Sequence, residues 1–318
     1  MVAVSQVLNA VRSVIGDGPA KLHEPLLQGK EREYVGQVIA SGHLSAGPWV
    51  ERFEAMLCEA TGAKYAVATC GGTAALHTAL ACSGLTAGTI KIPALTFVAT
   101  ANAALQAGMR PHFVEPEHAH IPVDLNGVES PAKGIVRDSA QSFGIPLTGT
   151  RIYSFNQNKP IACIGGAVVT DDTALADKIR KFTTTARVPH DFLVEHDGFA
   201  LNYRLSDIHA AIGVAQLEQW PVIKTAKEML AKRYKEAFDA IGVKMWPGTW
   251  LNSIMVDNRD EIIEALHQAG YKARCLPTPL HTLPHLKNCP KDDLSRTMAV
   301  WKQVVQLPSS PRLGLKYA

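Results

Sequence analysis

Strand-like and helix-like segments alternate along the first third of the chain, and this alternation most constrains the fold. "KYAVAT" (Lys64 to Thr69), "TIKIPA" and "RPHFVEP" are short apolar segments typical of buried strands. "GGTAALHTALACSG" and "TFVATANAALQAG" lie between them and have the length and apolar spacing of helices, each closed by a glycine. Strands that alternate with helices of this length predict a parallel, doubly wound α/β sheet.

The rest of the chain extends this pattern and adds a second unit. "KGIVRDSAQ" predicts a further strand with Asp138 at its carboxyl end, the edge where open α/β sheets bind ligands. After two long helices, the last 80 or so residues have the pattern strand, helix, strand, helix, which indicates a small α/β domain. We therefore expect an N-terminal helical arm (1–22), a large domain (23–222) and a small C-terminal domain (223–318).

Composition narrows the class of protein. The chain has 318 residues, 47% of them hydrophobic and 19% charged, with a net charge of +3, so we expect a soluble globular protein. It lacks the Lys/Arg blocks that favour nucleic acid as a partner. Six scattered cysteines suit a reducing cytoplasm, and no apolar run approaches the roughly 20 residues of a membrane span.

Lys159 is the residue most in need of an explanation. It stands in "YSFNQNKPIACIGGAVVTDD", between a polar turn and an apolar, glycine-rich run. A lysine here could simply close a solvated loop. However, Pro160 favours an extended backbone at Lys159, which places the side chain at the mouth of a strand. A desolvated lysine there could act as an amine nucleophile in Schiff-base chemistry.

Two further stretches have both an ordinary and a functional interpretation. "CGGTAAL" joins a strand to a helix, so the amides around Gly72 and the hydroxyl of Thr73 could bind a phosphate, or the turn could hold no ligand. Asp138 could cap a helix, or it could keep a pyridine nitrogen protonated. Phe97 and Ser154 are equally explained as a core aromatic and a strand hydroxyl.

Taken in order, these stretches resemble the DegT/DnrJ/EryC1/StrS family of pyridoxal-phosphate-dependent nucleotide-sugar aminotransferases. The matching stretches are "GGTAALHTAL", "PALTFVATANAALQAG", "RDSAQSFG", "YSFNQNKPIACIGGAVVTDD", "LNYRLSDIHAAIGVAQLE" and "ARCLPTPLHTLP". The resemblance implies a fold type I, aspartate aminotransferase-like α/β protein whose large domain has a mostly parallel sheet. The opening "LHEPLLQGKEREYVGQVIASGHLSAGPWVERFE" looks most like the branch that makes bacillosamine and legionaminic acid precursors.

The resemblance also implies roles for individual residues. Lys159 would form the Schiff base with pyridoxal 5'-phosphate (PLP) and then act as the acid and base. Asp138 would pair with the pyridine nitrogen, Gln141 would lie near the ring hydroxyl and Phe97 would stack on the ring. The phosphate would be held by Gly72, Thr73 and Ser154, and by Asn202 from the neighbouring subunit of a homodimer. Arg204, Arg274 and His281 match positions near the substrate.

The implied reaction moves the amino group of L-glutamate onto a keto sugar linked to UDP, dTDP or GDP, in the biosynthesis of a surface glycan or another amino sugar. The sequence departs from the family between "FVEPE" and "RDSAQ" and between "QSFG" and "YSFN", where segments are shortened. Arg137 also stands where relatives usually have an acidic residue. These departures leave open a noncatalytic homologue that binds cofactor or sugar. A sugar dehydratase on the same scaffold is the other alternative, and Lys159 argues against it.

A metal site is the remaining alternative. Glu115, His118 and His120 cluster in "HFVEPEHAH", but their spacing matches no standard ligand pattern, so a solvated loop is favoured and no metal is expected.

Overall fold

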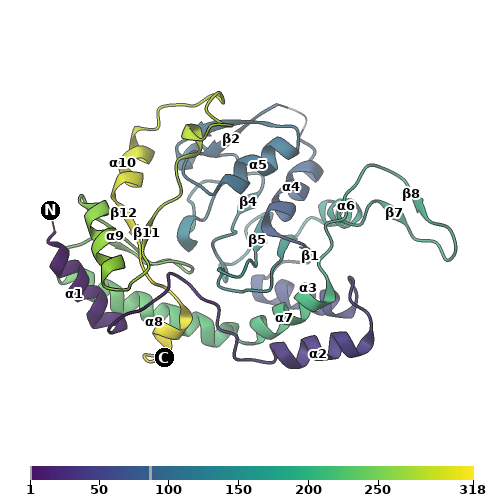
Figure 1. Cartoon of the computed structure of the whole chain (residues 1–318). Coiled ribbons are helices and arrows are strands. Elements are labelled where there is room, and N and C mark those ends of the chain that lie inside the picture. Colours follow the sequence, from purple (N-terminus) through teal and green to yellow (C-terminus); the bar gives the residue numbers. More distant parts are fainter. Residues whose placement is uncertain (1, 86–87) are drawn as a thin grey trace.

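The computed structural model describes residues 2–85 and 88–318, which form two lobes (Figure 1). The larger lobe contains a four-stranded sheet in the order β1 (Tyr65–Thr69), β6 (Gly166–Thr170), β5 (Arg151–Ser154) and β4 (Arg137–Asp138). Two further strands, β2 (Thr89–Pro93) and β3 (Arg110–Val114), pair in parallel. The α/β class expected from the sequence is confirmed, and the sheet is mixed because β6 runs antiparallel to both neighbours.

Helices cover both faces of this sheet. Side chains alternate between the two faces of a strand, so Ala66 and Ala68 of β1 enter one core while Val67 enters the other. The first core includes residues from α2 (Glu31–Ser41), α3 (Pro48–Thr61) and α7 (Asp207–Glu218). The second includes residues from α4 (Gly72–Cys82), α5 (Val98–Gln106) and α6 (Thr173–Thr183). The large lobe is therefore a three-layer sandwich.

The smaller lobe packs helices against an antiparallel sheet. Its strand order is β11 (Arg274–Cys275), β12 (Val304–Gln306), β10 (Ser253–Met255) and β9 (Met245–Trp246). Its helices are α1 (Val4–Ile15), α9 (Arg259–Gln268), α10 (Ser295–Gln303) and α11 (Pro311–Leu315). Strand β12 departs from the sequence prediction, in which the pattern of the small domain ended with a helix. The chain passes directly from α10 into β12, whose pairing partners are distant in sequence.

Helix α8 (Trp220–Asp239) connects the lobes (Figure 1). Ile223 near its start belongs to a core of the large lobe, whereas Leu230, Tyr234 and Phe238 belong to the core of the small lobe. The expected boundary between residues 222 and 223 falls inside this helix, so the two lobes share it. None of the helices in the described part of the chain has the length and apolar character needed to cross a membrane.

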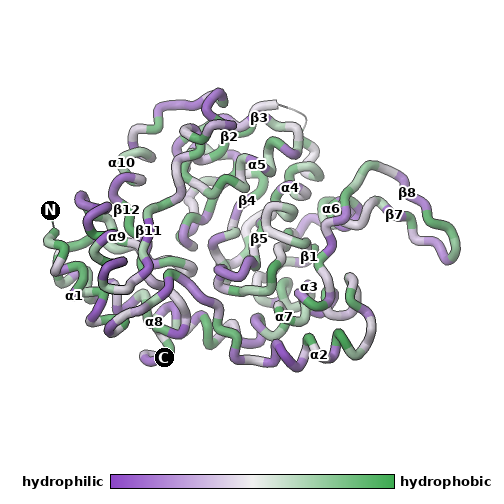
Figure 2. Tube along the Cα trace, in the orientation of Figure 1, coloured by the Kyte–Doolittle hydropathy of each residue, from purple (hydrophilic) through white to green (hydrophobic). Residues whose placement is uncertain are grey.

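A hairpin of β7 (Arg187–Val188) and β8 (Glu195–His196) projects from the large lobe (Figure 1). Apolar residues gather at its tip, as the hydropathy colouring in Figure 2 shows. Phe192 is 83% exposed and Val194 is 72% exposed, and Phe199, just beyond β8, is 85% exposed. Large apolar side chains exposed together in this way are typical of interaction surfaces.

Candidate active site

A cavity of about 600 Å³ lies between the two lobes and collects most of the predicted site residues. The large lobe contributes the strand ends and the turn before α4, and the small lobe contributes β11 and the loop before β10. Eight residues singled out from the sequence line it: Gly72, Thr73, Phe97, Asp138, Gln141, Ser154, Lys159 and Arg274.

The turn at the start of α4 is shaped to approach an anion closely. A methyl group on Gly72 would lie 2.6 Å from Cβ of Ser154, and one on Gly166 would lie 2.4 Å from the carbonyl carbon of Gly71. Side chains larger than hydrogen are therefore excluded where the turn meets β5 and β6. No side chain caps α4, and no acidic residue lies in its first turn. The first amides of the helix are thus free to bind a phosphate, as the cofactor would require.

Asp138 ends β4 with its carboxylate buried at the floor of the cavity. Oδ2 accepts a hydrogen bond from Thr100 Oγ1 at 2.7 Å, and Oδ1 accepts one from the backbone amide of Ala140 at 3.1 Å. Burial raises the pKa of this carboxyl group, while the two hydrogen bonds and the charge of Lys159 act in the opposite direction. A cationic partner in the cavity would therefore be favoured, which fits a protonated ring nitrogen.

The backbone around Asp138 is held by the segment 122–124. Asp138 donates its amide to the carbonyl of Pro122 at 2.8 Å and accepts from the amide of Asp124 at 3.0 Å. The segment "HIPVDLNG" contributes only an isolated parallel bridge here, between Val123 and Asp138. This bridge fixes the strand end that carries the Asp138 carboxylate.

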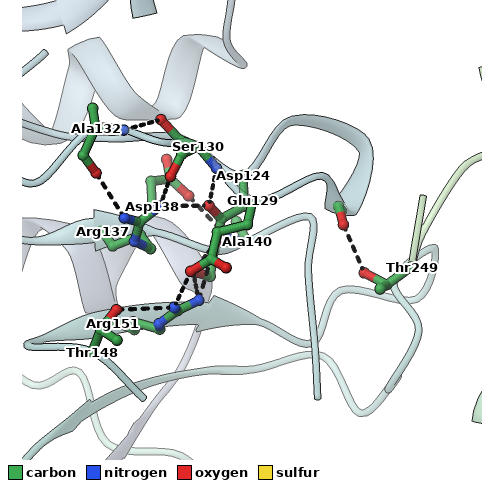
Figure 3. Close-up of polar contacts among 12 residues, drawn as sticks. Asp124, Glu129, Ser130, Ala132, Arg137, Asp138, Ala140, Thr148, Arg151 and Thr249 are labelled. Carbon is green, nitrogen blue, oxygen red and sulfur yellow. Dashed lines mark hydrogen bonds and ion pairs between the residues drawn. The ribbon is translucent and has the colours of Figure 1, made fainter. Parts of the chain in front are cut away.

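A buried ion cluster secures that segment (Figure 3). The Asp124 carboxylate accepts from Arg137 Nη1 at 2.9 Å, from Arg151 Nη1 at 3.3 Å and from Ser139 Oγ at 2.6 Å. Arg151 also pairs with Glu129 at 2.6 Å. In the sequence, Arg137 is only a departure from the family pattern. The sequence does contain a sign of this cluster: Arg137 and Arg151 each begin a buried strand, where a guanidinium needs an acidic partner.

Lys159 extends over an aromatic ring. Its Nζ lies 3.7 Å from the ring centroid of Trp250, a residue that the sequence analysis did not single out. Burial lowers the pKa of Lys159 to about 8; the charge of Asp138 opposes this shift and that of Arg274 adds to it. At pH 7 about one amine in ten is therefore neutral, far more than in an exposed lysine, and the neutral form is the nucleophile.

Hydrogen bonds fix two further cavity residues, Arg274 and Gln141. Arg274 donates from Nε to Oε1 of Gln306 at 2.7 Å, which holds its guanidinium at the small-lobe wall. Gln141 accepts at Oε1 from the amide of Asn126 at 2.9 Å. Asn126 also contacts the side chain of Gln306, so both walls of the cavity are linked by hydrogen bonds.

Three predicted residues lie outside this cavity. Asn202 pairs with Thr184 and accepts from Arg204 Nε at 3.0 Å, near the base of the projecting hairpin. Arg204 lines a separate hollow together with Arg187 and His190. His281 lies in the short 3-10 helix Leu280–Thr282, and its Nδ1 is buried without a hydrogen-bond partner. The role expected of Asn202 concerns a neighbouring subunit and stays a prediction.

The alternative of a metal site finds no support. Across residues 2–85 and 88–318, no group of three or more His, Cys, Asp or Glu side chains is placed to hold a metal ion. Glu115 instead accepts two hydrogen bonds from Thr297, and His120 Nδ1 accepts from the amide of Lys91.

An α/β fold with a phosphate-type turn, a buried carboxylate and a half-buried lysine in one cavity defines the fold type I class of PLP-dependent transferases. The sequence model of the DegT/DnrJ/EryC1/StrS aminotransferase family matches residues 25–134 and 132–317. The chain belongs to this family, and the aminotransferase class and PLP cofactor expected from the sequence are confirmed.

Individual relatives agree with this assignment. GDP-perosamine synthase of Vibrio cholerae is 29% identical, with 92% of this chain and 94% of the relative covered. A protein described as "Putative pyridoxal phosphate-dependent aminotransferase EpsN" in Bacillus subtilis (strain 168) is 31% identical, with 83% and 82% covered. The solved structure of Helicobacter pylori PseC, an aminotransferase involved in the biosynthesis of pseudoaminic acid, has a TM-score of 0.83 at 24% identity, with 92% and 93% covered, and shows the same fold.

The family match is broken at residues 132–134. This point lies between "FVEPE" and "RDSAQ", the first place where the sequence analysis expected a shortened segment. Asp124 and Glu129, the two acidic members of the ion cluster, lie in the same segment between β3 and β4.

Proposed function

We propose that the protein transfers the amino group of L-glutamate to a keto group, at C4 of the sugar, in a nucleotide-linked 4-keto-6-deoxy sugar. The product would serve surface glycan or amino-sugar biosynthesis in the cytoplasm. The observation that carries this proposal is that the half-buried Lys159 lines one cavity with Asp138 and the start of α4. Relatives named GDP-perosamine synthase support a nucleotide sugar as acceptor and make GDP the first nucleotide to test, ahead of UDP and dTDP.

The cavity residues would have separate roles in binding the cofactor and in moving protons. Gly72, Thr73 and Ser154 would hold the cofactor phosphate, Phe97 would cover the ring and Gln141 would lie beside its hydroxyl. Asp138 would keep the ring nitrogen protonated, and PLP supplies an electron sink when it is bound. The remaining task is proton transfer. Lys159 would bond the aldehyde and then move a proton between carbon and nitrogen, and its lowered pKa supports this role.

The substrate is expected to reach this site from the side of the small lobe. Arg274 is exposed at the cavity wall and would offer a cation to a carboxylate or phosphate. Arg204 and His281, which lie outside the cavity of their own subunit, would contact substrate only if the site were completed by other parts of the assembly.

A homodimer with shared active sites would supply that completion. The exposed apolar tip of the β7–β8 hairpin supports an interface there, because side chains such as Phe192 and Val194 are otherwise left in water. Asn202 and Arg204 lie at the base of the same hairpin, so a hairpin docked on a second subunit would bring them toward its cavity. Light scattering during gel filtration should give the mass of two chains.

The reaction itself is tested by visible absorbance. Purified protein with added PLP should develop a band of the protein-bound cofactor, and L-glutamate should convert it to the spectrum of pyridoxamine phosphate. A screen of GDP-, UDP- and dTDP-linked keto sugars then identifies the acceptor, and alternation of the two half-reactions predicts ping-pong kinetics. Acceptors of the bacillosamine and legionaminic acid branch belong in that screen.

Lys159→Ala should lose both the bound chromophore and turnover, because no other cavity residue offers an amine that can bond the aldehyde. Turnover retained in this variant would remove the central claim. A wild-type protein that binds no PLP would favour the noncatalytic homologue, the alternative suggested by the shortened segments.

A further inference from the structure

Trp250 contacts the amine of Lys159, although it belongs to the other lobe. It lies in the loop between β9 and β10, is 4% exposed and lines the cavity. Nζ of Lys159 lies 3.7 Å from its ring centroid, well inside the roughly 6 Å range of cation–π interactions. Among the described residues, no carboxylate lies within ion-pair distance of this amine. The indole face is therefore the main partner of the free amine.

The indole is held rigidly in this position. Its Nε1 donates to the carbonyl of Asn158, the residue immediately before Lys159, at 2.5 Å. The carbonyl of Trp250 accepts from the buried amine of Lys227 at 2.8 Å, and its amide donates to the carbonyl of Asn126 at 3.3 Å. One side chain thus contacts both the backbone before Lys159 and the end of its side chain.

We propose that Trp250 is a positioning residue that receives the ammonium group of Lys159 whenever this side chain is not bonded to the cofactor. This inference rests on the proposed role of Lys159. In each transamination cycle the amine is released and must stay close to the reacting carbon to move a proton. A ring face attracts an ammonium group through its quadrupole and engages no more than one N–H strongly, so other N–H groups remain available.

The same ring discriminates between the two cations of the cavity. The guanidinium carbon of Arg274 lies 5.7 Å from the ring centroid, whereas Nζ of Lys159 lies 3.7 Å from it. Arg274 is held back by its hydrogen bond to Gln306. Lys159 is therefore the cation that lies closest to the ring face, while Arg274 stays at the small-lobe wall.

Nuclear magnetic resonance tests the contact in the cofactor-free protein, without any activity measurement. Lysines are labelled by reductive methylation with ¹³C-formaldehyde, and the Lys159 signal is assigned by its loss in Lys159→Arg. The indole ring current should move this signal upfield of the solvent-exposed lysines. It should return to the ordinary position in Trp250→Leu and stay partly shifted in Trp250→Phe.

Trp246→Leu is the matched control, because Lys244 lies over the Trp246 ring with Nζ at 5.4 Å from the centroid. This variant should move the Lys244 signal and leave that of Lys159 in place. An unshifted Lys159 signal in the wild type, or one that Trp250→Leu does not move, would overturn the proposal. If Trp250→Leu does not fold, as judged by circular dichroism, the partial shift in Trp250→Phe decides.

Kinetics provide a second readout. Trp250→Leu should lower kcat by about 2- to 30-fold, the factor that corresponds to a cation–π contact, with little change in KM for glutamate, and Trp250→Phe should recover most of it. An equal loss in both variants would point to packing alone and contradict the positioning role. PLP absorbance without a ring-shifted Lys159 signal would overturn the role of Trp250 only; the shifted signal without absorbance would overturn the proposed function only.

Discussion

Asp124→Asn should destabilise the protein strongly, because the Asp124 carboxylate is fully buried between two guanidinium groups. Arg151 is also fully buried and the Arg137 side chain is only 10% exposed, so neither cation can be rehydrated without unfolding. Removing one partner of a buried ion pair lowers the free energy of unfolding by about 3–5 kcal/mol. Glu129 still pairs with Arg151 in the variant, so we expect the lower end, about 3 kcal/mol. At roughly 2 °C per kcal/mol, the midpoint of thermal unfolding should fall by about 6 °C.

Urea unfolding followed by far-UV circular dichroism measures this change. The matched control is Asp239→Asn, which removes a carboxylate paired with Lys235 at 2.6 Å on the surface of α8, where both side chains are more than half exposed. This exposed pair should contribute only about 0.3–0.5 kcal/mol. A loss below about 1 kcal/mol in Asp124→Asn would refute the reasoning, since it would mean that water reaches the two arginines.

The same variant should also weaken cofactor binding. The backbone pairing of Asp124 with Asp138 places the carboxylate under the cavity, so loosening this segment should raise the Kd for PLP at temperatures where the variant is still folded. PLP titration followed by absorbance checks this.

Three further predictions concern the cavity and its surroundings. Gly72→Ala should weaken PLP binding at least tenfold in an absorbance titration, because a methyl group there would lie 2.6 Å from Cβ of Ser154. The rate at which PLP bonds covalently to the protein, followed by stopped-flow absorbance, should rise with pH and level off above about pH 8 as Lys159 loses its proton. The charge of Asp138 raises the pKa of Lys159, so in Asp138→Asn the same rise should occur at lower pH. Burial lowers the pKa of Lys227 from 10.5 to about 7, so between these pH values the unfolded chain binds more protons than the folded protein. As pH rises through this window, the wild type should therefore gain stability relative to Lys227→Met, by up to about 1.4 kcal/mol per pH unit. Denaturation at several pH values measures this gain.

The core of the site could be predicted because its signals are local. The glycine turn before α4, the aspartate after an apolar strand and the lysine before β6 each have a pattern within a few residues. Strand ends of an α/β sheet lie at a common edge, so Gly72, Asp138 and Lys159 were expected to meet, and they line one cavity.

Other parts depend on contacts between distant segments and leave no local pattern. Trp250 meets Lys159 only because the small lobe docks on the large one. Strand β12 is three residues long and follows a helix without a break, so only its partners β10 and β11 define it. The antiparallel direction of β6 is likewise set by the path of the chain through the turn at Lys159, where apolar pattern carries no information on direction.

Helix α8 joins the two lobes, so a change in its direction would move the small lobe relative to the large one. It is about 30 Å long, so a tilt of about 5° at its start would move its far end by about 2.6 Å. The small-lobe wall of the cavity, with Trp250 and Arg274, would be carried with it. Substitutions in the buried face of α8 lie far from any reacting atom, yet they would change the distance between the Lys159 amine and its substrate. Such substitutions would therefore change the acceptor preference while the catalytic residues stay the same.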